Sequence, residues 1–304
     1  MLLYIAYNIA RFGISVVPRL VSVWIARRIA DMCFMFDGPA RRAVIANLTH
    51  VLSVTGRETA SRQARAKIIR LARESFENFA VHIVDFMRLS KVRGDIKKGL
   101  LKLEHIERFR KAFARGRGLI SITAHLGNWE MGAAATASEG FPLHAVALKF
   151  RDKKIDRFFS HLRDLGGIRL IDFNHAARGC FQAIKRKEMI AFVTDRDVNG
   201  NGYPVTFFGR QITIPRGPAE IGARSGAPIV PAFCVQDKNG CFRLCVEEPI
   251  EADEGMPMDE RVDQINRRMV ELMEQYIARY PSQWFAFYKV WNEYDEAVRP
   301  DPRV

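Results

Sequence analysis

The sequence predicts an α/β fold: a single domain built on a mostly parallel central sheet flanked by helices, with membrane-associating amphipathic helices at its amino terminus. From residue 119 onward, short apolar runs alternate with helical patterns of about ten to fifteen residues, which is typical of a parallel sheet. Hydrophobic residues make up 48% of the 304 and charged residues 27%, so the chain can bury a large core. No stretch of linker composition divides residues 37–304.

The first 36 residues are predicted to form two helices that lie on an anionic membrane surface. Four arginines interrupt their apolar side chains, Pro18 divides them, and no uncharged run reaches the roughly 20 residues that a spanning helix needs. Basic side chains among apolar ones suit the headgroup region of a bilayer. An ordinary pair of packed helices and a single tilted span remain the alternatives.

The remaining elements follow from periodicity and turn signals. After Asp37-Gly38-Pro39, helical periodicity runs through 40–48 and again from about 57 to 90. Strands are predicted at 119–123, 143–148, 167–172, 189–195, 227–235 and 241–248. Helices are predicted at 128–140, 153–166, 175–187, 215–226 and 259–280. The turn at 237–240 is expected to make the last two strands an antiparallel hairpin.

The excess of positive charge predicts an acidic partner. The formal net charge is +13, from 47 Lys and Arg against 34 Asp and Glu. Nucleic acid, an anionic membrane and an acidic carrier protein would each fit. The sequence has neither an aromatic–basic nucleic-acid motif nor the hydrolase motif GxSxG, which argues against those two classes. One basic cluster consists of Lys97, Lys98, Lys102, Arg108, Arg110, Lys111, Arg115 and Arg117.

The stretch SITAHLGNWE, residues 121–130, is the strongest indication of chemistry. His125 directly follows a predicted strand, and ligand crevices of α/β sheets lie at the carboxyl ends of strands. Asn128 suits a helix N-cap, Gly127 allows a sharp turn, and Glu130 then falls in the first helical turn. In that geometry Glu130 can accept a hydrogen bond from one ring nitrogen of His125 and leave the other nitrogen basic.

A pair without an enzyme nucleophile suits direct attack of a substrate hydroxyl on an activated acyl group. A core histidine and a zinc site with Glu130 as ligand are the alternatives, although no further zinc-ligand pattern supports the second. A non-catalytic membrane scaffold would need neither His125 nor Glu130. Asp195 and Asp197 follow the run IAFVT, residues 190–194, of another predicted strand, so two strand ends offer reactive side chains on one edge of the sheet.

HLGNWE resembles the first motif, His-x4-Asp/Glu, of the lipid A late acyltransferases, the lauroyl and myristoyl acyltransferases of the glycerolipid acyltransferase superfamily. Three more blocks are similar and follow in the family's order, at 148–172, 195–233 and 281–292. The resemblance covers residues 1–293. It implies a glycerolipid acyltransferase-like α/β fold and an enzyme that transfers acyl groups other than amino-acyl groups.

The resemblance implies that His125, oriented by Glu130, takes a proton from an acceptor hydroxyl that attacks an acyl thioester. It also implies substrate-binding residues: Arg151, Arg163, Asp195, Asp197, Arg216 and Gly217. Arg151 is a candidate for the tetrahedral oxyanion or for an acceptor phosphate, with a surface arginine as the alternative. Phe207 and Phe208 are candidates for an acyl channel, or else for the core.

Two of these assignments have a physical basis beside the resemblance. Asp195 and Asp197 either hold a sugar of the acceptor or shape the loop that follows them. Arg216 and Gly217 precede a predicted helix, whose amino-terminal amides could bind phosphate. The two tryptophans of the closing block are expected to pack the C-terminal segment rather than to touch substrate.

The resemblance further implies the substrates and the location. The acceptor is a lipid A precursor or a related glycolipid; a phospholipid or aminolipid is the alternative, because Arg196 replaces a usual Gln and the closing block lacks His-Arg-Arg. The donor is an acyl thioester of acyl carrier protein or coenzyme A, with no metal and no other cofactor. The expected location is the cytoplasmic face of a bacterial inner membrane, peripheral or single-pass. Five cysteines without a disulfide pattern also indicate a reducing compartment.

Overall fold

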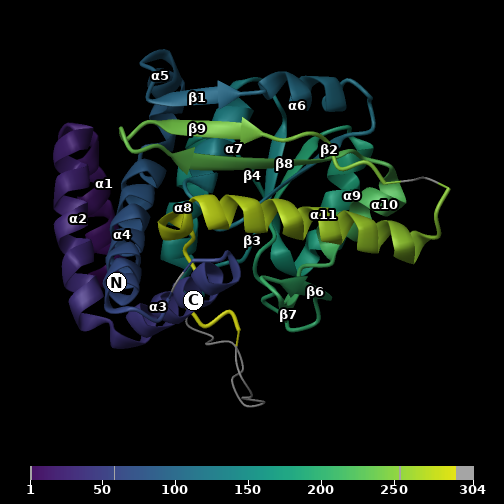
Figure 1. Ribbon diagram of the computed structural model, residues 1–304. Coiled ribbons are helices and arrows are strands. Elements are labelled where there is room, and N and C mark those ends of the chain that lie inside the picture. The colour runs from purple at the N-terminus through teal and green to yellow at the C-terminus, as the bar shows by residue number, and fades with distance from the viewer. Residues whose placement is uncertain (1, 58, 253–254, 292–304) are drawn as a thin grey trace.

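Seven strands form one sheet in the order β1-β9-β8-β2-β5-β3-β4 (Figure 1). The structure is a computed structural model that describes residues 2–57, 59–252 and 255–291. The strands of the sheet are β1 (Leu101–Glu104), β2 (Leu119–Thr123), β3 (Leu143–Ala147), β4 (Arg169–Asp172), β5 (Met189–Val193), β8 (Ile229–Gln236) and β9 (Phe242–Val246). A separate antiparallel ribbon consists of β6 (Tyr203–Phe207) and β7 (Arg210–Ile214).

The centre of the sheet is parallel. β2 pairs in parallel with β5 and β8, and β3 pairs in parallel with β5 and β4. β8 and β9 form an antiparallel hairpin, and β1 pairs in parallel with β9 at the edge. The predicted fold class and the predicted hairpin are therefore confirmed. β1 and the β6–β7 ribbon are absent from the prediction, because short strands of mixed polarity give no clear period.

Helices cover both faces of the sheet. One face is covered by α4 (Arg62–Phe86), α5 (Val92–Lys97), α6 (Ile106–Phe113), α7 (Trp129–Ser138) and α8 (Lys153–Leu165). The β6–β7 ribbon covers the other face with α9 (Ala176–Lys185), α10 (Gly217–Ser225) and α11 (Met258–Arg279), and Figure 1 shows α11 crossing that face. Short 3-10 turns are η1 (Leu89–Lys91), η2 (Phe173–His175) and η3 (Pro281–Gln283). Because both faces are covered, β2 is buried from its start as far as Ile122.

Side-chain caps decide where several helices begin. α3 (Gly38–Val54) starts after Asp37, whose Oδ1 accepts from the backbone N of Ala40 at 3.1 Å. Ser61 caps α4 in the same way, by accepting from Ala64 N at 3.1 Å. The helix predicted from about residue 57 therefore begins at Arg62.

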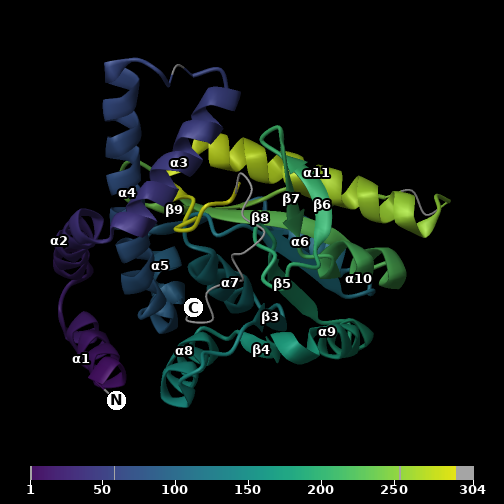
Figure 2. The same ribbon diagram turned by 90° about the horizontal axis from the view of Figure 1, so that it is seen from below.

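Two helices precede these: α1 (Leu2–Val16) and α2 (Arg19–Phe36). They lie at one end of the molecule, outside α4, in both views (Figures 1 and 2). Many of their large apolar side chains face outward; Phe12 is 70% exposed, Leu20 78%, Trp24 64% and Phe36 83%. None of the helices in the described ranges is sufficiently long and apolar to cross a membrane.

A buried ion pair joins α2 to α4. Arg19 donates from Nε to Oδ1 of Asp85 and from Nη2 to Oδ2, both at 2.7 Å. The Asp85 side chain is inaccessible to solvent, and burial raises its pKa above the ordinary value despite the hydrogen bonds from Arg19. Removing one partner would leave the other charge buried alone.

Replacing Arg19 with Met is expected to destabilise the protein by about 3–5 kcal/mol, because Asp85 becomes an unpaired buried charge. The double variant Arg19→Met/Asp85→Leu removes both charges and is expected to recover most of the loss. Urea unfolding in mild detergent measures both. Arg11→Met is the control, because Arg11 has no ion pair within the described ranges. A loss of unfolding free energy in Arg11→Met as large as that in Arg19→Met would contradict the prediction.

Candidate active site

His125 lies in a tight loop between β2 and α7, at the carboxyl edge of the sheet. Gly127 has a φ of +64°, and a Cβ atom there would lie 2.1 Å from the carbonyl oxygen of Cys234 in β8. Both facts restrict the position to glycine. The Asn128 side chain accepts from the backbone N of Met131 at 3.1 Å and caps α7. The predicted sharp turn and N-cap are therefore confirmed.

Asp195 is hydrogen-bonded to His125. Its Oδ1 accepts from Nδ1 of the imidazole at 2.8 Å and from the backbone N of His125 at 3.0 Å. The register of β2 and β5 pairs Thr123 with Val193, and each of the two site residues follows its strand by the same number of residues. Neighbouring parallel strands thus deliver the two side chains to the same edge at the same level.

A tryptophan holds the other oxygen of Asp195. Oδ2 accepts from the indole Nε1 of Trp284 at 2.9 Å. Burial would raise the pKa of Asp195, but the charge of His125 and the hydrogen bonds from His125 and Trp284 outweigh it, so the pKa lies below its ordinary value. Asp195 is therefore ionised at neutral pH. Because a carboxylate only accepts hydrogen bonds, the neutral form of His125 has its proton on Nδ1 and its free lone pair on Nε2.

The segment after α11 forms a wall of this site. Trp284 pairs with Leu126 in an isolated antiparallel bridge, and the backbone N of Phe285 donates to the carbonyl oxygen of His125 at 2.8 Å. The expectation that the tryptophans pack the C-terminal segment misses the contact of Trp284 with the carboxylate. Its only sequence signal is its place in the closing block, whose last residue, Asn292, lies outside the described residues.

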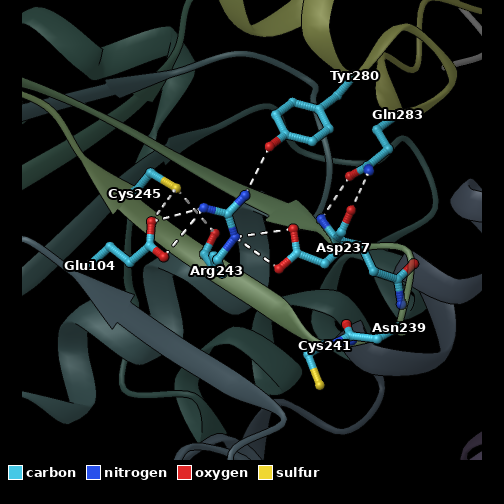
Figure 3. Close-up of polar contacts among 9 residues, drawn as sticks. Glu104, Asp237, Asn239, Cys241, Arg243, Cys245, Tyr280 and Gln283 are labelled. Carbon is cyan, nitrogen blue, oxygen red and sulfur yellow. Dashed lines mark hydrogen bonds and ion pairs between the residues drawn. The ribbon is translucent and has the colours of Figure 1, made fainter.

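A polar network anchors this segment to the sheet (Figure 3). Gln283 exchanges two side-chain hydrogen bonds, at 2.7 and 2.8 Å, with the backbone of the last residue of β8. Arg243 in β9 donates to the hydroxyl of Tyr280 at 2.8 Å and is itself held by the carboxylates of Glu104 and Asp237. These bonds determine where Trp284, next along the chain, meets the site.

Glu130 is paired with Arg163 of α8, not with His125. Nη2 of Arg163 lies 2.6 Å and Nε 3.0 Å from Oε1 of Glu130, and the guanidinium lies over the ring of Phe86. Within the described ranges, Glu130 forms no hydrogen bond to His125. The predicted orientation of His125 by Glu130 is therefore corrected: Asp195 occupies Nδ1, while Glu130 turns toward α8. A catalytic role of Glu130 stays a prediction.

A second histidine lies behind the imidazole. The ring of Trp129 meets the His125 ring edge-on, with centroids 5.1 Å apart, and stacks on His82 of α4 at 4.0 Å. Burial lowers the pKa of His82 to about 4, so its ring is neutral at pH 7. The sequence gives no signal for this contact, because His82 stands alone in a long helical pattern.

Asp197 and Arg216 shape the loop 198–202. Asp197 accepts from two backbone N–H groups of the loop, at 3.1 and 2.7 Å. Arg216 donates from Nε to two of its carbonyl oxygens, at 2.9 and 3.2 Å. Gly217 begins α10 directly after Arg216. Loop shaping is thus what Asp197 does, and binding of substrate by any of these residues stays a prediction.

The remaining predicted residues lie apart from the imidazole. Arg151 is exposed on the loop between β3 and α8, at the same edge of the sheet, and has no hydrogen bond within the described ranges. Phe207 and Phe208 are buried in the core at the turn of the β6–β7 ribbon, where Phe207 stacks on Trp291. The core alternative therefore describes their surroundings, and their role in an acyl channel stays a prediction.

A narrow apolar cavity of about 30 Å³ lies between α7 and the sheet. Its helix side is lined by Trp129 and by the small residues Gly132, Ala133 and Thr136. Trp129 lines the cavity and its ring also contacts His125, so this side chain touches both.

The fold and the site together define an α/β enzyme whose histidine is held by a buried carboxylate, an arrangement that suits proton removal from a hydroxyl group. The chain belongs to the bacterial lipid A biosynthesis acyltransferase family, whose model matches residues 1–293. It is therefore an acyltransferase of lipid biosynthesis.

Two mycobacterial proteins are similar to this chain. The phosphatidylinositol mannoside acyltransferase of Mycolicibacterium smegmatis is 24% identical over 249 residues, which cover 81% of this chain and 77% of that protein. The phosphatidylinositol mannoside acyltransferase of Mycobacterium tuberculosis is 22% identical over 249 residues, which cover 81% of this chain and 75% of that protein.

Asp195→Asn is expected to lower kcat of acyl transfer by about 10⁴-fold, because an amide favours the wrong tautomer of His125. Glu130→Gln is the matched comparison. It is expected to lower the Tm, because Arg163 loses its buried ionic partner, with a far smaller loss of kcat in the folded protein. Steady-state transfer and thermal unfolding of both variants measure the difference.

The stability of the protein at low pH gives a second readout for Asp195→Asn. The folded-state pKa of Asp195 lies below its ordinary value of 3.8, so its contribution to stability is complete above that pH and is lost as the pH falls through the folded-state pKa. Below about pH 4, the unfolding free energy of Asp195→Asn should therefore depend less on pH than that of the wild type.

A larger loss of kcat in Glu130→Gln than in Asp195→Asn would overturn the assignment of Asp195 as the residue that orients His125.

Proposed function

We propose that the protein moves a fatty acyl chain from an acyl thioester to a hydroxyl group of a glycolipid, with His125 as general base. The observation that carries this proposal is the contact of 2.8 Å between Nδ1 of His125 and Asp195. The His125 side chain is 35% exposed, and Nε2 has no hydrogen bond within the described ranges. A basic nitrogen open to a substrate is what general-base catalysis requires.

The proposed reaction needs no nucleophile from the enzyme. The acceptor hydroxyl attacks the thioester carbonyl while Nε2 takes its proton, which forms a tetrahedral oxyanion and an imidazolium. The carboxylate of Asp195 stabilises the imidazolium through Nδ1. When the intermediate collapses, the carbon–sulfur bond breaks and the leaving thiolate takes the proton from Nε2. The histidine is then neutral for the next cycle.

Two charged residues have proposed supporting roles. Arg151 is exposed at the carboxyl edge and has no hydrogen bond or ion pair with the described residues, which suits a donor to the oxyanion or to a substrate phosphate. Glu130 is proposed to act by position: its ion pair with Arg163 holds α7 to α8 beside the loop of His125. Neither role requires Glu130 to touch the imidazole.

The first carbons of the acyl chain are proposed to lie at the cavity between α7 and the sheet, whose volume of about 30 Å³ is too small for a whole fatty acyl chain. Its lining is mostly apolar, three small residues line its helix side, and Trp129 contacts both the cavity and His125. A thioester carbonyl at the imidazole would therefore place the first carbons of the chain near this cavity. Phe207 and Phe208 do not line it.

The acceptor is proposed to be a phosphate-bearing glycolipid. The family description points to a lipid A precursor, whereas the two similar mycobacterial proteins are named for phosphatidylinositol mannoside. A phospholipid or an aminolipid stays the alternative. The reaction at His125 is the same for either glycolipid, so only transfer to each acceptor distinguishes them.

The donor is proposed to be acyl carrier protein or acyl coenzyme A, both of which are acidic. The basic cluster at 97–117 is a weak candidate for its binding surface, because Arg108, Arg110 and Arg115 pair with glutamates. The last residues of the cluster also precede the amino end of β2, roughly 17 Å of strand away from His125. The exposed basic residues of the β3–α8 region, including Arg151, lie at the carboxyl edge and are better placed.

Membrane binding is proposed to occur through α1 and α2. Their exposed apolar side chains lie on helices that also carry arginines, a combination that suits an anionic headgroup region. β8 is parallel to β2, and its carboxyl end points toward α4 and these helices (Figure 1). The carboxyl end of β2, which His125 follows, therefore points the same way. The site would then open toward the lipid that supplies the acceptor.

The first experiment is radiolabelled acyl transfer from acyl carrier protein and from acyl coenzyme A, with the lipid A precursor and phosphatidylinositol mannoside as separate acceptors. The wild type is expected to acylate one of the two glycolipids. The transfer rate of His125→Ala is expected to be at least about 10³-fold lower, because the variant removes the base and its orientation. His161→Ala, an exposed histidine of α8, is the control. Equal transfer by wild type and His125→Ala would exclude His125 as the base.

The double variant Phe12→Glu/Leu20→Glu is expected to weaken binding to phosphatidylglycerol vesicles by at least about tenfold, because each buried apolar side chain contributes about 1.5–3 kcal/mol. Vesicle sedimentation measures the partition coefficient. Phe181→Glu on α9, at the other end of the molecule, is the matched control. Unchanged binding of the double variant would show that α1 and α2 do not contact the membrane.

A further inference from the structure

Arg196 lies over an aromatic ring beside the catalytic pair. It follows Asp195 directly, and its Cζ lies 4.5 Å from the centroid of the Tyr288 ring. The side chain is half-buried and forms neither a hydrogen bond nor an ion pair with any part of the chain that the structure describes. A cation–π contact uses none of the N–H donors of a guanidinium, so those of Arg196 stay available to a ligand.

Tyr288 is fixed in place by a single buried side chain. Asn47 of α3 donates to the backbone carbonyls of Tyr288 at 2.8 Å and of Ala286 at 3.0 Å, and accepts from the backbone N of Val290 at 3.2 Å. The ring therefore restrains the guanidinium before any ligand arrives. Such pre-organisation lowers the entropic cost of binding.

The charge of Arg196 is not neutralised by the acids beside it. Both oxygens of Asp195 are occupied, one by His125 and one by Trp284. Asp197 accepts from the backbone of the loop that follows. In the run Asp-Arg-Asp, the two acids are thus used by the protein, and the arginine between them is the member whose donors remain unused.

We propose that Arg196, stacked on Tyr288, binds the phosphate group of the lipid acceptor and thereby places the acceptor hydroxyl at Nε2 of His125. This inference rests on the proposed function. A guanidinium presents two parallel N–H donors to two phosphate oxygens, a match that the single ammonium of a lysine lacks. Arg196 binds and positions the acceptor; it forms and breaks no covalent bond.

The test measures KM for each substrate in Arg196→Gln, Arg196→Lys, Tyr288→Phe and Tyr288→Leu. Arg196→Gln is expected to raise the acceptor KM for phosphatidylinositol mannoside or the lipid A precursor by roughly tenfold or more, because it loses a charge-assisted pair of hydrogen bonds. Arg196→Lys should recover only part of the affinity for the acceptor, and Tyr288→Leu should raise the acceptor KM more than Tyr288→Phe does. Arg224→Gln on α10, exposed and far from the site, is the control.

Two phosphate-free substrates identify the source of the phosphate. With a mannosyl diacylglycerol as acceptor, the defect of Arg196→Gln should disappear. With an acyl N-acetylcysteamine thioester as donor, the defect should remain. A defect that disappears only with the phosphate-free donor would assign Arg196 to the donor and overturn the proposal, as would unchanged KM values in Arg196→Gln.

A binding measurement separates this proposal from the proposed function. Equilibrium dialysis of radiolabelled glycerophosphoinositol against the full-length protein is expected to show about tenfold weaker binding for Arg196→Gln than for wild type or Arg224→Gln. Absence of acyl transfer by wild type would sink the proposed function, yet this difference would still support a phosphate site. Equal binding by all three proteins would sink the phosphate site alone.

Discussion

The buried carboxylate of Asp195 is the constraint on which the site depends. An isolated carboxylate is costly to bury, and here three donors compensate it: the backbone N and Nδ1 of His125, and Nε1 of Trp284. The donors come from the loop after β2 and from the segment after α11, which are far apart in sequence. Satisfying one charge thereby fixes three segments of the chain relative to one another and sets the tautomer of the imidazole.

The two acids near the imidazole differ because their partners differ. Glu130 is neutralised by the guanidinium of Arg163, so its charge is already compensated. Asp195 has two neutral donors, the backbone N of His125 and Nε1 of Trp284, besides the imidazole itself, so its charge remains available to stabilise an imidazolium. The ion pair of Arg19 with Asp85 is similar, because there too an arginine compensates the charge of a buried acid. Of the two acids near the imidazole, only Asp195 is bonded to it, and the catalytic role of Glu130 stays a prediction.

The arrangement of the segments also connects the site with its proposed surroundings. α4 carries His82, which supports Trp129 behind the imidazole, and the same helix packs against α2 through Arg19 and Asp85. α1 and α2 lie outside α4 (Figure 2), and many of their large apolar side chains are exposed. One helix therefore lies between the proposed membrane-binding surface and the catalytic loop.

The sequence by itself determined the local structure: the strand ending before His125, the turn at Gly127, the N-cap at Asn128 and the family motifs. These depend on periodicity and turn chemistry, which act over a few residues. Only the tertiary structure decided the partner of His125. Glu130 is near His125 in sequence, but the strand order places β5, and with it Asp195, beside β2. Trp284, which follows His125 by 159 residues, completes the contacts of Asp195. Hydrogen-bond partners are set by which segments pack together, and sequence spacing does not encode that.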